Sequence, residues 1–87
     1  MDYQLTFSAQ AHKDSRKLEY SPLKETVHKL LSIVARNPFQ NPPPYEKLSD
    51  EIPHLYSRRI NIHHRLVYRV FEDEHIVRIL HMWTHYE

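Results

Sequence analysis

The spacing of hydrophobic residues changes within the first twenty positions of the chain. Residues 2–7 alternate polar and apolar side chains with a period of two, which predicts a first β-strand. Ser8 then offers a helix N-cap. Residues 9–19 are rich in helix formers, with Ala11 and Leu18 as the main apolar positions. We therefore expect a strand followed by a weakly amphipathic helix.

A second helix is predicted to begin at Ser21 and Pro22, because an N-cap followed by proline at the first helical position is a common start. It should end by Asn37, since Pro38 disfavours helix in the residue before it. The apolar residues between these limits recur at helical spacing on one face, and we expect them to pack in the core: Leu23, Val27, Leu30, Leu31 and Val34. Two helices joined so closely predict a helical hairpin.

Residues 38–53 are expected to be irregular, because four of the six prolines fall within seven positions. The run Pro42-Pro43-Pro44 predicts a stiff extended rod. Such a rod would hold the following segment, Tyr45-Glu46-Lys47-Leu48, in a fixed place.

Three further strands are predicted at residues 54–60, 63–71 and 75–84, and the acidic turn before the last one makes a hairpin of the final two. In the middle strand, His64, Leu66, Tyr68 and Val70 should share one face, and Arg65, Val67, Arg69 and Phe71 the other. In the last strand, Ile76, Arg78, Leu80 and Met82 should oppose Val77, Ile79, His81 and Trp83. The order β-α-α-β-β-β predicts an α+β domain with a mostly antiparallel sheet and one working surface.

The composition of the chain excludes several kinds of binding site and membrane segment. Eighty-seven residues predict a single domain, residues 1–87. The absence of cysteine excludes disulfides and thiolate metal sites, and the absence of glycine excludes the glycine-rich loops that bind nucleotide phosphates. No apolar run reaches the roughly 18 residues of a membrane span, and the N-terminus does not resemble a signal peptide. We expect a cytoplasmic protein with no membrane association.

The charges are distributed unevenly, although the net charge is only +1. In residues 1–53 seven cations balance seven anions. In residues 54–87 all five cations are arginine, and three of the four acids sit together at Glu72-Asp73-Glu74. Arginine presents a planar fork that binds phosphate in a bidentate manner. A sheet of this composition is a plausible RNA-facing surface, although arginine also suits solvent-facing strands.

Cleavage of RNA without a metal requires a base for the ribose 2′-hydroxyl, a cation for the phosphorane and an acid for the departing 5′-oxygen. Glu46, Arg65 and His85 could divide these tasks, with Arg59 and Tyr86 in support. Trp83 could stack on a base. These residues are far apart in sequence, so spacing alone does not select them.

A metal site is the weaker reading of the histidines. His63 and His64 are adjacent, and His81 and His85 are four positions apart. On a strand, two residues four apart share a face but lie about 13 Å from each other, too far to bind one ion. We expect neither a metal nor another cofactor.

The second half of the chain resembles the Txe/YoeB family of toxin–antitoxin modules, within the RelE/ParE superfamily. The resemblance spans essentially the whole chain and is dense from residue 37 onward. It is carried by Asn37-Pro38-Phe39, Tyr45-Glu46-Lys47-Leu48, Tyr56-Ser57-Arg58-Arg59-Ile60, His64-Arg65-Leu66-Val67-Tyr68 and the closing His85-Tyr86. It implies a RelE-like microbial ribonuclease fold and a ribosome-dependent endoribonuclease that cleaves mRNA and halts translation.

By position, Glu46 resembles the general base of the family, Arg65 its phosphate-stabilising arginine with Arg59 in support, and His85 the general acid. Tyr86 resembles the terminal tyrosine that shapes the site. The resemblance further implies an antitoxin of the YefM/Phd type, whose C-terminal segment folds over the toxin, and it allows a homodimer.

Two positions depart from the family pattern. Glu87 follows the tyrosine on which members often end, which puts any role for a terminal carboxylate in doubt. Ser49 stands where some members carry a lysine, and Lys47 is kept as a candidate phosphate contact in its place.

Besides a ribonuclease, the sequence leaves two other hypotheses open. A superfamily member without catalysis could act as a binding module for its antitoxin and DNA, or poison gyrase. An orphan domain with lost activity is the third reading.

Overall fold

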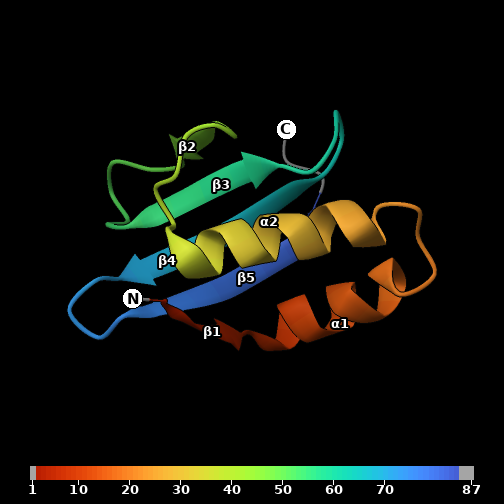
Figure 1. Ribbon diagram of the computed structural model, residues 1–87, viewed down its shortest axis with the longest axis horizontal. Helices are drawn as coiled ribbons and strands as arrows, with labels where there is room; N and C mark the ends of the chain where they lie inside the picture. The colour runs from red at the N-terminus through yellow and green to blue at the C-terminus, as the bar shows by residue number, and fades with distance from the viewer. Residues whose placement is uncertain (1, 85–87) are drawn as a thin grey trace.

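The computed structural model describes residues 2–84, and of Trp83 and Thr84 it describes the backbone only. The elements in chain order are β1 (Gln4–Phe7), α1 (Ala9–Leu18), α2 (Lys24–Arg36), β2 (Tyr45–Lys47), β3 (Leu55–Arg59), β4 (Arg65–Phe71) and β5 (Ile76–Thr84). The strands form one sheet in the order β1-β5-β4-β3-β2, in which β1 runs parallel to β5 and every other pair is antiparallel (Figure 1). The predicted α+β fold with a mostly antiparallel sheet is confirmed.

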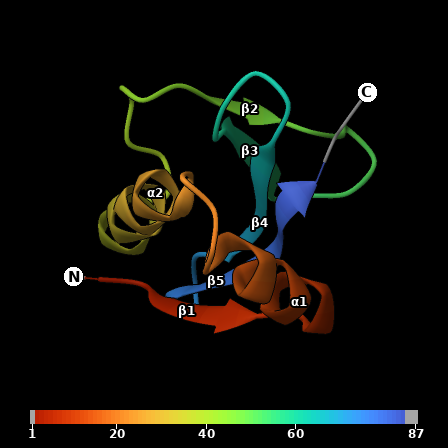
Figure 2. The ribbon, with the colours of Figure 1, turned by 90° about the vertical axis from the view of Figure 1, so that its right-hand side faces the viewer.

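Both helices pack on the same face of the sheet, and the core lies between them and the strands (Figures 1 and 2). The helices contribute Ala11, Leu18, Val27, Leu30 and Val34, and the central strands contribute Leu66, Tyr68, Val70, Val77 and Ile79. The predicted helical hairpin and the predicted core face of β4 are therefore confirmed. No helix of residues 2–84 covers the other face of the sheet, and we call it the open face (Figure 2).

The helix boundaries follow their capping residues, with one difference from the prediction. The Ser8 hydroxyl accepts a hydrogen bond from the Ala11 amide at 3.0 Å and so caps α1. Asn37 is extended and ends α2, as predicted. The predicted start of α2 at Ser21 and Pro22 is wrong: the Ser21 hydroxyl accepts from the Leu23 amide at 3.0 Å in a tight turn, and the helix begins at Lys24.

The proline-rich segment differs from its prediction in two ways. It contains a short strand, β2, which pairs with β3, so residues 38–53 are not wholly irregular. It also bends at Pro42 and Pro43, so the predicted stiff extended rod is wrong. The segment instead curves around Arg58, which donates to the carbonyl oxygens of Pro38 and Pro43.

Strand β5 does not keep the simple alternation predicted for it. Ile79 pairs with Tyr68 and His81 with Val67, so the register shifts between these pairs. This irregularity places Met82, like Ile79, in the core instead of on the opposite face. The prediction fails because the register between β4 and β5 shifts twice, between Tyr68 and Val67 and between Val67 and Arg65, and each shift interrupts the regular alternation of β5.

In residues 2–84 no helix combines the length and the apolar character that crossing a membrane requires.

Candidate catalytic site on the open face

The sheet register brings Glu46, Ser57 and Arg65 together on the open face. Glu46 of β2 lies opposite Ser57 of β3, and Arg59 of β3 lies opposite Arg65 of β4. Because side chains alternate along a strand, Glu46 points away from the face on which its neighbours Tyr45 and Lys47 project. The pairing of β2 with β3 and that of β3 with β4 thus bring together residues that are up to nineteen positions apart in the sequence.

Arg65 is the centre of this cluster. Its Nη1 lies 3.4 Å from Glu46 Oε2 and 3.4 Å from Ser57 Oγ. The Arg65 side chain is 25% exposed and that of Glu46 is 67% exposed. An ion pair this long and this exposed contributes little to stability. The guanidinium therefore has neighbours that orient it and still has donors to offer to an incoming anion.

The cluster lines a cavity of about 250 Å³ bounded by Pro44, Tyr45, Glu46, Ser57, Arg59 and Arg65. The cavity thus holds one carboxylate, one hydroxyl and two guanidinium groups. A carboxylate can accept a proton, and two arginines can bind the non-bridging oxygens of a phosphate. Three of the predicted site residues, Glu46, Arg59 and Arg65, are brought together here.

Ser57 is a member of the cluster that the sequence interpretation did not single out. It is 1% exposed, and its hydroxyl accepts from Arg65. The one sequence signal is its spacing of two from Arg59, which places both on the same side of a strand.

The other predicted site residues lie elsewhere. Lys47 is exposed and, by strand alternation, projects on the face opposite Glu46, so it is not brought into the cluster. Nothing is described of the Trp83 side chain, and His85 and Tyr86 lie outside the described residues. The backbone of β5 does reach the cluster, because Thr84 pairs with Arg65.

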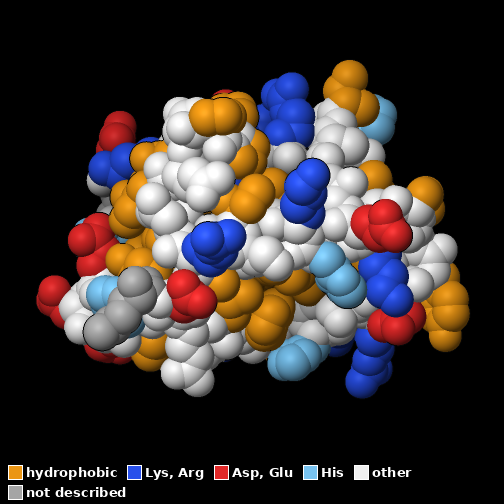
Figure 3. Space-filling view, in the orientation of Figure 1, with side chains coloured by type: hydrophobic (Ala, Val, Ile, Leu, Met, Phe, Trp, Pro, Cys, Tyr) orange, Lys and Arg blue, Asp and Glu red, His pale blue; other side chains and the backbone are white. Residues whose placement is uncertain are grey.

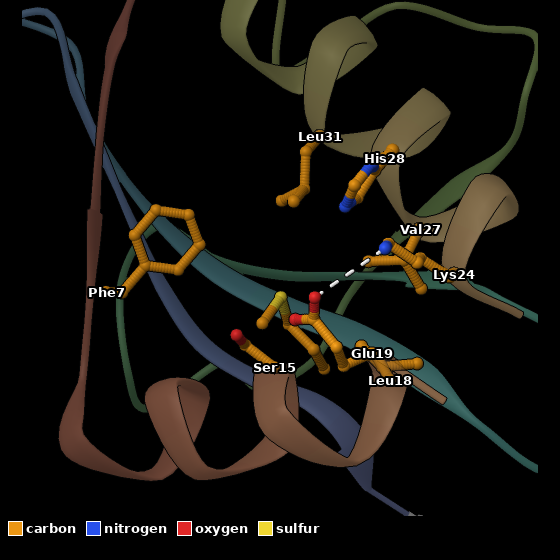
Figure 4. Close-up of a pocket in the computed structure, with 9 residues that line it drawn as sticks. Phe7, Ser15, Leu18, Glu19, Lys24, Val27, His28 and Leu31 are labelled. Atoms are coloured by element: carbon orange, nitrogen blue, oxygen red, sulfur yellow. Dashed lines mark ion pairs between the residues drawn. The ribbon is translucent and has the colours of Figure 1, made fainter. Parts of the chain in front are cut away.

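A second cavity, of about 190 Å³, lies on the helix side, between α1, α2 and the sheet (Figure 4). Phe7, Val27 and Leu31 are among the residues that line it. The Glu19 carboxylate and the Lys24 ammonium form an ion pair at 3.7 Å (Figure 4). Among the described residues that line this cavity there is one lysine and no arginine, so the open-face cluster with its two arginines is the better candidate for chemistry on a phosphate.

Comparison with known proteins agrees with this fold. Residues 7–86 match the sequence model of a family described as the YoeB-like toxin of bacterial type II toxin–antitoxin systems. Over 75 residues the chain is 31% identical to Toxin YoeB of Streptomyces coelicolor, which covers 84% of this chain and 89% of that protein. The chain belongs to the YoeB-like toxin family.

Solved structures show the same relationship. A YoeB/ParE toxin from Agrobacterium tumefaciens matches with a TM-score of 0.84 and 25% identity, over 95% of this chain and 99% of that one. YoeB from Staphylococcus aureus is 31% identical over 99% of this chain and 100% of its own. It matches with a TM-score of 0.79 as a YoeB–YefM complex and 0.81 as a YoeB dimer.

Proposed function

We propose that this chain is the toxin of a type II toxin–antitoxin module and acts as a ribosome-dependent, metal-independent mRNA endoribonuclease that inhibits translation. The observation that carries the proposal is the position of the Arg65 guanidinium, 3.4 Å from the Glu46 carboxylate and lining the same cavity as Arg59. A base candidate beside two phosphate-binding cations is the arrangement that 2′-hydroxyl attack on a phosphate requires.

In the proposed reaction Glu46 removes the proton from a ribose 2′-hydroxyl, and the 2′-oxygen forms a bond to the adjacent phosphorus. Arg65 stabilises the negative charge of the phosphorane, with Arg59 as a second cation. His85 donates a proton to the 5′-oxygen as its bond to phosphorus breaks, because a histidine titrates near neutral pH. The products are a 2′,3′-cyclic phosphate and a free 5′-hydroxyl. Tyr86 and Trp83 are proposed to contact the RNA beside this centre.

Ser57 is proposed to position Arg65. It is almost fully buried and contacts the same Nη1 atom as Glu46, so it limits the orientations of the guanidinium. Catalysis by preorganised charge depends on such fixed donors.

The proposed partner is an antitoxin of the YefM type, whose C-terminal segment folds over the toxin. Support comes from the S. aureus relative, which is solved as a YoeB–YefM complex. The same relative is also solved as a YoeB dimer, and a homodimer is the second assembly proposed for this chain.

The test is translation in vitro with mapped mRNA cleavage ends. The wild-type chain should cut mRNA on the ribosome. Arg65→Ala should lower the rate by about 10²- to 10³-fold through loss of charge stabilisation. His85→Gln should lower it by about 10²- to 10⁴-fold through loss of the general acid. Arg16→Ala, which removes an exposed cation of α1, is the matched control and should cleave normally.

Intact mRNA with the wild-type chain would contradict the proposal. If the chain arrests growth and the arrest survives combined loss of Glu46, Arg65 and His85, the chain is a binding module and not a nuclease.

A further inference from the structure

Two arginines on the central strands lie directly opposite each other. Arg69 of β4 pairs with Arg78 of β5. Both project from the open face, because their neighbours Val70 and Val77 are buried in the core on the helix side. Like charges placed directly opposite each other in a sheet destabilise it. This juxtaposition therefore needs a compensating anion or a functional reason.

Within residues 2–84 neither arginine forms an ion pair with a carboxylate. Arg78 Nη1 lies 3.5 Å from the Thr6 hydroxyl, which is a weak contact. The Arg69 guanidinium lies 5.3 Å from the centre of the Phe71 ring. In the described part of the chain, Arg69 Nε is buried and has no hydrogen-bond partner. Neutral groups thus orient both side chains and leave their positive charges uncompensated.

The acids near this end of the sheet form no ion pair with Arg69 or Arg78 in residues 2–84. Glu72, Asp73 and Glu74 form the turn between β4 and β5 and line a cavity with His54 and Phe71. The helix side of the molecule, by contrast, mixes charges of both signs over its surface (Figure 3). On the open face, Arg69 and Arg78 lie at one register position without a paired carboxylate in residues 2–84.

The pair shares its face and its strand with the proposed catalytic cation. Arg65 and Arg69 are four residues apart on β4, which corresponds to about 13 Å along the strand. At this separation the pair is placed for a phosphate other than the one at Arg65. Two arginines at one register position of neighbouring strands are suited to a phosphodiester, because each guanidinium can bind phosphate oxygens through two nitrogen atoms.

We infer that Arg69 and Arg78 form a second phosphate-binding site, which holds the backbone of the same RNA strand at a phosphate beyond the one that is cut. The inference rests on the proposed function, because it takes RNA as the ligand. It adds a binding subsite, so it predicts a dependence on the length of the RNA.

The test compares short and long RNA on the wild-type chain and on the double variant Arg69→Gln, Arg78→Gln. The probes are a dinucleotide and a longer single strand, both with a 2′-deoxy residue at the cleavage position so that binding is measured without cleavage. The wild type should bind the long strand more tightly. The double variant should lose about 10-fold in affinity for the long strand and little for the dinucleotide. Its salt dependence should also fall, by about 0.7 in log K against log salt for each phosphate contact that is lost.

Controls separate charge from folding and from general electrostatics. The variant Arg16→Gln, Arg36→Gln removes two exposed cations from the helices and should leave the length dependence unchanged. The variant Arg69→Lys, Arg78→Lys keeps the charge and should restore most of the salt dependence but only part of the affinity. Thermal melts establish that each variant is folded.

Equal losses for the dinucleotide and the long strand would overturn the inference, as would no loss for either. A double variant that binds RNA normally but binds a YefM-type antitoxin weakly would also overturn it, since the ligand would then be an acidic protein surface. A wild-type chain that binds the long strand no more tightly than the dinucleotide would overturn the inference. A wild-type chain that leaves mRNA intact on the ribosome would instead contradict the proposed function, so the two failures are distinguishable.

Discussion

Arg58 is a fully charged side chain that is only 1% exposed. A buried charge is costly unless it is hydrogen bonded. Arg58 donates to the Tyr68 hydroxyl at 3.1 Å, to the Pro38 carbonyl at 3.0 Å and to the Pro43 carbonyl. Its guanidinium also lies 5.0 Å from the centre of the Tyr45 ring. The adjacent Arg59 is exposed and lines the candidate site. Arg58 therefore stabilises the proline-rich segment, whereas Arg59 is available to a ligand in the cavity.

Burial raises the pKa of Tyr68 to about 12, and the nearby Arg58 opposes part of that rise. In the unfolded chain the pKa is about 10. Between these values the folded protein holds a proton that the unfolded chain has lost, so stability falls as the pH rises from about 10 to about 12. A difference of two units corresponds to about 3 kcal/mol.

We therefore predict that Tyr68→Phe removes this alkaline fall in the free energy of unfolding. Urea denaturation at pH 9 to 12 would measure it. The variant should be less stable at neutral pH, because Arg58 Nε loses its acceptor, and its stability curve should be flatter above pH 10. Tyr20→Phe is the matched control, since Tyr20 is 93% exposed and should leave the curve unchanged. Parallel curves for the wild type and Tyr68→Phe would contradict the prediction.

Helix α1 takes the place of a strand along the end of β5. Strand β1 ends at Phe7, and beyond it the backbone of β5 has no strand on that side. The Ser8 hydroxyl donates to the Leu80 carbonyl at 2.8 Å, and Asp14 Oδ2 accepts from the Met82 amide at 3.0 Å. Asp14 is only 3% exposed. Two side chains of the helix thus satisfy the backbone where β5 departs from regular register.

We predict that Asp14→Ala destabilises the domain by about 1–3 kcal/mol, because it leaves the buried Met82 amide without an acceptor. Asp14→Asn should cost less, since the amide oxygen can still accept. Amide hydrogen exchange at Met82 is the local measurement and should accelerate in Asp14→Ala more than at the core residue Val70. Equal effects of the two substitutions would show that the Met82 contact does not stabilise the fold.

At the scale of elements, hydrophobic periodicity predicted the helices and strands whose formation depends on neighbouring residues. The apolar stripe of α2 and the alternation of β4 were both confirmed, because each is written in consecutive residues. Strand β2 was missed, since its three residues follow prolines and depend on pairing with a distant strand. The irregularity in β5 was missed because its apolar pattern runs on without a break. The sequence analysis did not single out Asp14, because only the tertiary structure shows that its carboxylate accepts from the Met82 amide.

The candidate site depends on the whole molecule, which limits what the sequence could predict of it. Motif resemblance selected Glu46, Arg59 and Arg65, and the fold brings these three together. Ser57 required the register of β2, β3 and β4. The roles assigned to His85 and Tyr86 stay predictions. No spacing rule connects such residues, because the sheet order β1-β5-β4-β3-β2 is set by long-range pairing.

The first and last strands, β1 and β5, form the parallel pair of the sheet, so the integrity of the whole domain should depend on its first strand. Leu5 and Phe7 of β1 pack against the core, and β1 pairs with β5 over all four of its residues, Gln4–Phe7. Removal of β1 would expose these apolar contacts and leave the edge of β5 unpaired. A domain of this size has little stability to spare.

We predict that deletion of residues 1–7 abolishes the cooperative thermal transition measured by circular dichroism, while deletion of residues 1–2 leaves it in place. The shorter deletion keeps the contact of the Tyr3 amide with the Ala35 carbonyl and the whole of β1. The site should fail together with the fold in the longer deletion, although none of its residues is removed. A folded and active product of that deletion would show that the sheet forms without β1, and that the parallel pair of β1 and β5 is not required for folding.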